Sequence, residues 1–183
     1  TTFCQVADQA TDISPLLISE EITNHDLSTV DNETVAIADL LSKQPTVLIF
    51  YRGGWCPFCN AHLSSIGEVT EDIKNLGFQI IAVSPDAPHQ LSASQQKQEL
   101  EYTLLSDSEG NFIKAMGIAH KAPDDYESLL SDFSDGKNKS FLPVPSLFIV
   151  NTNSEISFEY ISPDYKQRMS SALLLQVLKT IEM

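Results

Sequence analysis

Two cysteines three residues apart, Cys56 and Cys59, are the residues of this chain best suited to do chemistry. The apolar, β-branched run at 46–51 just before them is typical of a buried strand. A helical pattern follows them, and Pro57 suits its first turn, where a missing N–H costs nothing. Free N–H groups and the dipole at a helix N-terminus favour a thiolate and lower a cysteine pKa from about 8.5 by one or more units. The pair therefore predicts redox chemistry through a reversible disulfide.

Metal binding is the main alternative for these cysteines. Cys56, Cys59 and His62 stand at three-residue spacing, and Cys4 is a fourth potential ligand. A structural zinc site usually takes a second closely spaced pair of ligands, and this sequence has none. We therefore expect no metal and no other cofactor. A redox sensor or a zinc-binding interaction module stays open as a non-enzymatic reading.

The elements that must position the cysteines alternate between strand and helix patterns. Strands are expected at 24–27, 34–37, 46–51, 78–83, 102–105, 146–150 and 156–160. Helices are expected at 1–14, 38–43, 57–76, 88–101, 111–116 and over a final stretch that carries Leu174, Val177, Leu178 and Ile181. This order predicts an α/β fold with a central mixed β-sheet flanked by helices and an N-terminal β-hairpin extension. The length suits a single domain over residues 1–183.

The stretch 119–142 lacks a clear strand pattern and has only a short helical one. Tyr126, Leu130 and Phe133 have helical spacing within it. Two interpretations stay open for this segment. It is either a packed surface insertion, or a lid or partner-contact segment beside the cysteines.

Composition excludes several classes of function. Acidic residues outnumber basic ones by 25 to 11, which gives a net charge of −14. Such a surface repels nucleic acids and anionic membranes, and no apolar run approaches the ~18 residues of a membrane span. Three cysteines are too few for a disulfide-rich secreted domain, so we expect a cytoplasmic, reducing compartment. Because the sequence begins at Thr1 without Met, a removed signal stays open.

Several segments together carry a family resemblance. Residues 51–60, read as YRGGWCPFCN, resemble the active-site segment of the alkyl hydroperoxide reductase/thiol-specific antioxidant family, the peroxiredoxin-like proteins of the thioredoxin superfamily. Residues 104–110 (LLSDSEG) and 143–150 (PVPSLFIV) are similar to its downstream segments, and 163–165 with Arg168 to a tail of some members. The resemblance implies a thioredoxin-like fold and hydroperoxide reduction, with a thioredoxin-like protein or small thiol as reductant. It also raises the expectation of a homodimer.

The chain departs from the family pattern P-x-x-x-T/S-x-x-C at two positions. With Cys59 as the last residue, Arg52 takes the proline position and Cys56 the Thr position. The Arg that usually precedes the penultimate strand is missing from 144–146. The hydroxyl and cation that orient a peroxide are therefore absent or supplied differently. This keeps open a thioredoxin-like thiol–disulfide oxidoreductase that acts on disulfides with little peroxidase activity.

The resemblance leaves the roles of the two cysteines open. In the peroxiredoxin alignment Cys59 attacks the peroxide and becomes a sulfenic acid, and Cys56 resolves it to a disulfide. In thioredoxin-like dithiol enzymes the first cysteine, here Cys56, is the nucleophile. Both sequences of events end in the same Cys56–Cys59 disulfide.

Three further residues are candidates for substrate binding. Arg52 lowers a thiol pKa if it points inward, and is otherwise a solvated residue at a strand end. Trp55 is expected to form a wall of the site or part of the core. Pro145 resembles the cis-proline that faces the cysteines in thioredoxin-like folds. For Arg168 a place on a helix surface is the safer interpretation, although it could reach the site.

Overall fold

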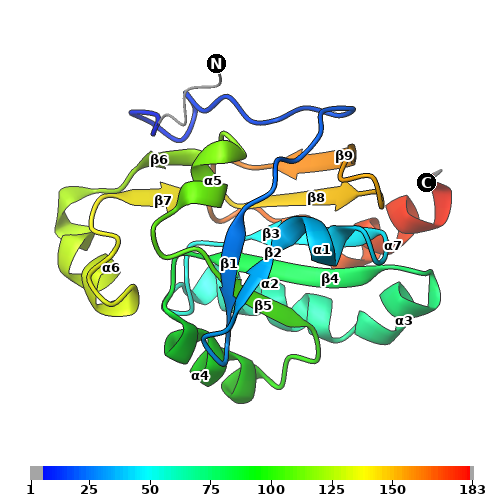
Figure 1. Cartoon of the computed structure of the whole chain (residues 1–183), viewed down its shortest axis with the longest axis horizontal. Coiled ribbons are helices and arrows are strands. Elements are labelled where there is room, and N and C mark those ends of the chain that lie inside the picture. The colour runs from blue at the N-terminus through cyan, green and yellow to red at the C-terminus, as the bar shows by residue number, and fades with distance from the viewer. Residues whose placement is uncertain (1–5, 182–183) are drawn as a thin grey trace.

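A computed structural model describes residues 6–181, and its centre is a mixed sheet of seven strands in the order β2-β1-β5-β4-β3-β8-β9 (Figure 1). Its strands are β1 (Asp26–Thr29), β2 (Thr34–Ala36), β3 (Thr46–Phe50), β4 (Gln79–Ser84), β5 (Thr103–Ser106), β8 (Ser146–Val150) and β9 (Ile156–Ile161). A second, two-stranded sheet pairs β6 (Ala119–Lys121) with β7 (Phe141–Pro143). The predicted mixed sheet and α/β class are confirmed.

Helices cover both faces of the large sheet. They are α1 (Ile37–Leu41), α2 (Pro57–Gly67), α3 (Thr70–Asn75), α4 (Pro88–Gln98), α5 (Asn111–Ala115), α6 (Glu127–Phe133) and α7 (Ser171–Thr180), with a 3₁₀ turn η1 (Asp124–Tyr126). One core cluster joins α2, α3, α4 and α7 to one face, and another joins α1 and α5 to the opposite face. Within residues 6–181, no helix is both long and apolar enough to span a membrane.

Strand β3 positions the cysteines from the middle of the sheet. It runs parallel to β4 and antiparallel to β8, and all of its residues are buried. Burial on both faces explains why its sequence is continuously apolar rather than alternating. The Tyr51 N–H donates to the Val83 carbonyl at 3.1 Å and so extends the β3–β4 ladder by one residue. The chain then turns into α2 with its end held by two neighbouring strands.

The predicted N-terminal hairpin is confirmed as part of this sheet. β1 and β2 pair antiparallel, and β1 also pairs with β5, so the hairpin extends the sheet at one edge (Figure 1). The helix predicted over 1–14 is wrong for the described residues 6–14. Backbone bonds tie this stretch to β6 instead, from Ala7 N to Ala119 O at 2.9 Å and from Lys121 N to Ala7 O at 2.8 Å. Residues 1–5 lie outside the described part of the chain.

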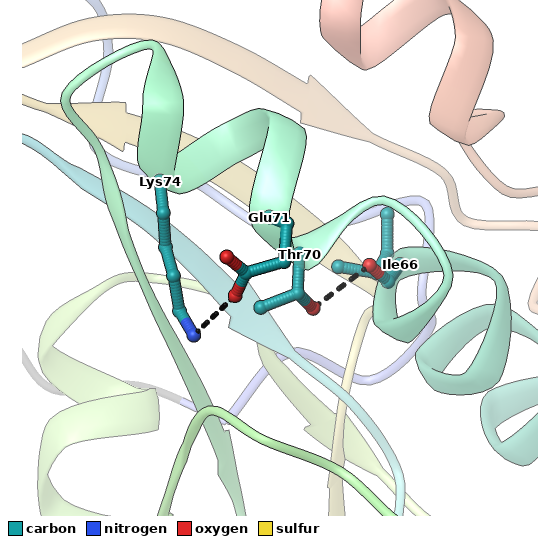
Figure 2. A network of polar contacts seen from close by, with 4 residues as sticks. All are labelled: Ile66, Thr70, Glu71 and Lys74. Carbon is teal, nitrogen blue, oxygen red and sulfur yellow. Dashed lines mark hydrogen bonds and ion pairs between the residues drawn. The ribbon is translucent and has the colours of Figure 1, made fainter.

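The helix predicted over 57–76 is divided into α2 and α3. Val69, between them, has φ −113° and ψ 14°, and its N–H donates to Ile66 O at 3.1 Å in a tighter, 3₁₀-type turn. The Thr70 hydroxyl donates to the same carbonyl at 3.2 Å (Figure 2). A Thr that bonds back to the carbonyl four residues earlier bends a helix. The apolar spacing predicted the helical character but not this interruption.

The segment 119–142 contains more structure than its sequence pattern indicated. The predicted helical turns are present as η1 and α6, and the β6–β7 pair that flanks them was not predicted. Figure 1 shows α6, β6 and β7 together at one end of the molecule. Buried Asn138 holds the return to β7, because its side-chain amide donates to Phe141 O at 2.9 Å and its oxygen accepts from Ser140 N at 3.1 Å.

The α2–α3 junction provides a test of this account. We expect Thr70→Val to lower the free energy of unfolding by about 1 kcal/mol, because it removes a buried hydrogen bond and keeps the side-chain shape. Urea unfolding followed by circular dichroism measures the change. Glu71→Gln is the matched control, since it breaks only the exposed 2.9 Å ion pair to Lys74 and should leave the urea midpoint unchanged (Figure 2). Equal midpoint shifts for the two variants would contradict the role of Thr70.

Candidate active site

Both cysteines lie at the N-terminus of α2, as predicted. Cys56 is the N-cap residue, and its carbonyl accepts from Asn60 N at 3.0 Å to close the first turn. Cys59 lies in that first turn. The side chains are 1% and 0% exposed, and both thiols are free. The structure therefore places two reduced sulfurs together in a site that is closed to solvent.

The two thiols have opposite pKa shifts because they interact directly. The hydrogen bond from the Cys59 thiol lowers the pKa of Cys56 to about 6, against the effect of burial. The Cys59 backbone N–H and the charges of Arg52 and Arg168 lower it further. The interaction with Cys56, followed by burial, raises the pKa of Cys59 well above its ordinary value. These interactions favour the thiolate on Cys56 and the proton on Cys59.

Arg168 contacts the pair directly, so its placement on a helix surface was wrong. Its Nη2 lies 3.5 Å from Cys59 Sγ. Its Nη1 donates to the carbonyls of Tyr165 and Gln167, the latter at 2.9 Å. These bonds fold the guanidinium back along the loop between β9 and α7, and α7 begins only at Ser171. Arg168 therefore places a cation beside Cys59 from the loop before α7.

Arg52 points inward and is only 6% exposed, so the solvated interpretation was wrong for this residue too. Its guanidinium carbon lies 4.2 Å from the Tyr165 ring centroid, 5.1 Å from that of Trp55 and 5.5 Å from that of Tyr126. Trp55 and Tyr126 also pack edge to face at 5.6 Å. Segment 119–142 therefore reaches the residues beside the cysteines through Tyr126.

A buried carboxyl group supports the turn before α2. The Asp86 carboxylate accepts a hydrogen bond from Gly54 N at 2.6 Å, and burial raises the pKa of this group to about 7. Gly53 has φ +146°, and a Cβ there would overlap Trp55 Nε1 and lie 2.6 Å from Asp86 Oδ1. Only glycine fits this position. Sequence analysis missed Asp86, although it follows β4, whose carboxyl end adjoins that of β3.

Pro145 does not have the predicted cis geometry. All peptide bonds of the described residues are trans. The Val144 N–H donates to Ile118 O at 2.8 Å, and Pro145 O accepts from Ser162 N at 3.2 Å, so the chain passes in extended form from β7 into β8. Pro145 shares a cavity of about 10 Å³ with His62 and Arg168, and the two sulfurs lie outside its lining. It therefore lies next to the arginine that contacts Cys59.

His62 makes a structural hydrogen bond to the backbone near Arg168. Its Nε2 lies 3.1 Å from the carbonyl of Met169, which only accepts, so the ring donates from this nitrogen. Burial, with the charge of Arg168, lowers the pKa of His62 to about 4, and the ring is neutral at pH 7. Over residues 6–181, no three His, Cys, Asp or Glu side chains converge as metal ligands. Cys4, the fourth ligand considered, falls outside that range.

Comparisons with known proteins agree with this geometry. The family model described as "AhpC/TSA family" matches residues 18–159. "Peroxiredoxin Bcp" of Escherichia coli (strain K12) is 23% identical over 167 residues, which cover 91% of this chain and 98% of the relative. "Putative peroxiredoxin bcp" of Haemophilus influenzae is 26% identical over 106 residues, 58% of this chain and 68% of that protein.

Solved structures show the same fold at low sequence identity. Peroxidoxin BcpB from Mycobacterium tuberculosis superposes with a TM-score of 0.70 at 17% identity, over 91% of this chain and 98% of that one. Reduced Prx3 from Vibrio vulnificus, in complex with hydrogen peroxide, superposes with a TM-score of 0.74 at 18% identity, over 89% and 99%. These likenesses confirm the predicted thioredoxin-like fold. Because the family model spans most of the chain, both cysteines included, this protein belongs to the AhpC/TSA family.

Proposed function

We propose that this protein is a thiol-dependent peroxidase that reduces hydroperoxides through Cys56 and Cys59. The observation that carries the proposal is a pair of free, interacting thiols at the N-terminus of α2, with a guanidinium 3.5 Å from one of them. The family membership supports it, because the relatives are named peroxiredoxins. Arg168, whose Nη2 lies 3.5 Å from Cys59 Sγ, also supports it, because it supplies a cation beside the cysteine pair.

The reaction consists of two steps and a reduction. The thiolate attacks one oxygen of the hydroperoxide, the O–O bond breaks, and the products are a sulfenic acid and an alkoxide that takes a proton to become an alcohol. The second thiol attacks the sulfenic sulfur, which forms the Cys56–Cys59 disulfide and releases water. Two electrons and two protons from an external dithiol, or from two thiols, then restore both cysteines by exchange.

We assign the attacking role to Cys56. The thiolate is the nucleophile, and Cys56 is deprotonated near pH 7 while Cys59 holds its proton. Cys59 is then the resolving residue. The family alignment assigns the two roles in the opposite order, and the contact from Arg168 to Cys59 favours that order. Chemical trapping of the sulfenic acid distinguishes the two assignments.

One observation favours a second candidate, a thiol–disulfide oxidoreductase with little peroxidase activity. Cys56, the first cysteine of the C-x-x-C pair, has the lower pKa, which is the arrangement of thioredoxin-like dithiol enzymes. The same couple would then attack a disulfide sulfur instead of a peroxide oxygen. Peroxide consumption with a thioredoxin system, measured beside insulin reduction at equal enzyme concentration, separates the two functions.

The partners follow from the chemistry of a disulfide that must be reduced again. We propose a thioredoxin-like protein or a small thiol as the reductant, and a cytoplasmic location, where a supply of thiols maintains the reduced couple. Phe58 is 41% exposed and packs against Tyr165, so an apolar surface adjoins the cysteine turn where a protein reductant would dock. A homodimer stays a prediction, which light scattering tests.

The pKa of Cys56 predicts how its reactivity depends on pH. Alkylation of Cys56 by iodoacetamide, mapped by mass spectrometry, should be half-maximal near pH 6 and level off above pH 7, because acid protonates the thiolate only below its pKa of about 6. Cys59 should stay unreactive throughout this range. Free glutathione is the control, with an ordinary thiol pKa of about 8.5. A midpoint for Cys56 near that of glutathione would remove the basis for its assignment as the nucleophile.

The roles of the two cysteines are tested by trapping the sulfenic acid. After mild peroxide treatment, the Cys59→Ser protein should label with a dimedone-type probe on Cys56, because no resolving thiol remains. The Cys56→Ser protein should label much less on Cys59, because burial still raises the pKa of this thiol after the contribution of Cys56 is removed. The wild-type protein should show two protected thiols and no label. Labelling of Cys59 alone would reverse the roles, and three reactive thiols after peroxide would contradict the couple itself.

A further inference from the structure

Arg52 is a buried cation for which residues 6–181 provide no carboxylate partner. Its side chain is 6% exposed, and its surroundings are aromatic. The ion pairs of residues 6–181 all involve other side chains, and within that range its guanidinium donates no hydrogen bond. A buried charge is costly unless it is paired and hydrogen-bonded. The ring contacts offset part of this cost and leave the N–H donors unused.

Arg168, the other cation of the site, is engaged differently. Its Nη1 donates to two backbone carbonyls, and its Nη2 contacts Cys59. The loop therefore uses the donors of Arg168 to fix its own shape and to hold one sulfur. Arg52 remains as the cation with donors available to a ligand.

An interaction with the Cys56 thiolate would use only some of the hydrogen-bond donors of Arg52. The charge of Arg52 lowers the pKa of Cys56, so the two groups are close enough to interact. A sulfur is a single weak acceptor, whereas a guanidinium presents five N–H donors in a planar fork that matches a carboxylate in bidentate fashion. The net charge of −14 repels anions from the protein as a whole, so a preference for anions here must come from the site itself.

The aromatic cluster around Arg52 borders the protein surface. Tyr165 is 36% exposed and Tyr126 is half-buried, so the outer edge of the aromatic contacts reaches the surface. The two tyrosines come from different segments, η1 and the loop after β9.

We propose that Arg52 recognises a carboxylate on the small substrate that reacts at Cys56, so that the enzyme prefers carboxylate-bearing hydroperoxides or thiols over their neutral counterparts. The proposal rests on the proposed redox function of the same site. In it, the carboxylate accepts two hydrogen bonds from Arg52, and the reactive O–O bond or sulfur of the ligand lies toward Cys56. Both kinds of ligand, the hydroperoxide and the thiol, carry an anionic carboxylate near the group that reacts.

The first test compares two alkylating agents of similar size, anionic iodoacetate and neutral iodoacetamide, on Cys56 in a Cys4→Ser background. Arg52→Met should lower the iodoacetate/iodoacetamide rate ratio by about tenfold, the size expected for a lost charge-assisted hydrogen bond. Arg52→Lys, which keeps the charge, should lie between Arg52→Met and the parent. Lys166→Met is the matched control, since it removes a cation 5.8 Å from the Tyr165 ring and should leave the ratio within about twofold.

The second test separates the two sources of a carboxylate. Stopped-flow rates of oxidation are compared for linoleic acid hydroperoxide and its methyl ester, and rates of disulfide reduction for 3-mercaptopropionate and its methyl ester. We expect the parent protein to prefer the acid by about tenfold or more in one of these half-reactions, and Arg52→Met to lose that preference. The half-reaction with the preference identifies the ligand as the hydroperoxide or as the thiol.

The outcomes distinguish this proposal from the proposed function. An unchanged alkylation ratio in Arg52→Met, or no acid preference in either half-reaction, overturns the role of Arg52. If the parent protein consumes no hydroperoxide but keeps the alkylation and thiol preferences, the peroxidase function fails while the carboxylate site stands. Arg52→Gln replaces Arg52→Met if circular dichroism shows that the latter is misfolded.

Discussion

The direct interaction between the thiols of Cys56 and Cys59, in a site from which water is almost excluded, is the feature on which the surrounding residues depend. An isolated thiolate at 1% exposure would be costly, so its charge must be met by oriented groups. The α2 N-terminus, the Cys59 thiol and two arginines meet it. Because the stabilisation of one sulfur comes partly from the proton on the other, the two thiols act as a unit and cannot be tuned separately.

The direct interaction of the two thiols also relates the departures from the family pattern to one another. The Thr position holds Cys56, so the group beside Cys59 is a second sulfur instead of a hydroxyl. No arginine stands at 144–146, and Arg168 contacts Cys59 from the loop before α7. Arg52 stands at the proline position, where it lies among aromatic rings. The chain keeps the cations and changes their positions in the sequence.

Sequence patterns predicted those helices and strands whose formation depends mainly on neighbouring residues. The strand at 46–51, the helix after Pro57 and the hairpin near the N-terminus follow from residue types and spacing, and all are confirmed. Asp86 was missed, and Arg168 was assigned to a helix surface, because their place in the site depends on how distant segments pack. The interruption between α2 and α3 depends on one Thr hydroxyl, whose choice of acceptor no periodicity reveals. For Pro145, backbone bonds to neighbouring segments decide the geometry.

Trp55 gives this protein an internal optical reporter. It is the chain's single tryptophan, directly precedes the cysteine pair, and packs against Arg52 and Tyr126. Its indole N–H is buried and lacks a hydrogen-bond partner among the described residues. Indole emission responds to nearby charge, and the conversion of a thiolate and thiol to a disulfide removes a negative charge next to the ring. The intrinsic fluorescence of the unlabelled protein should therefore follow the redox state of its own active site in real time.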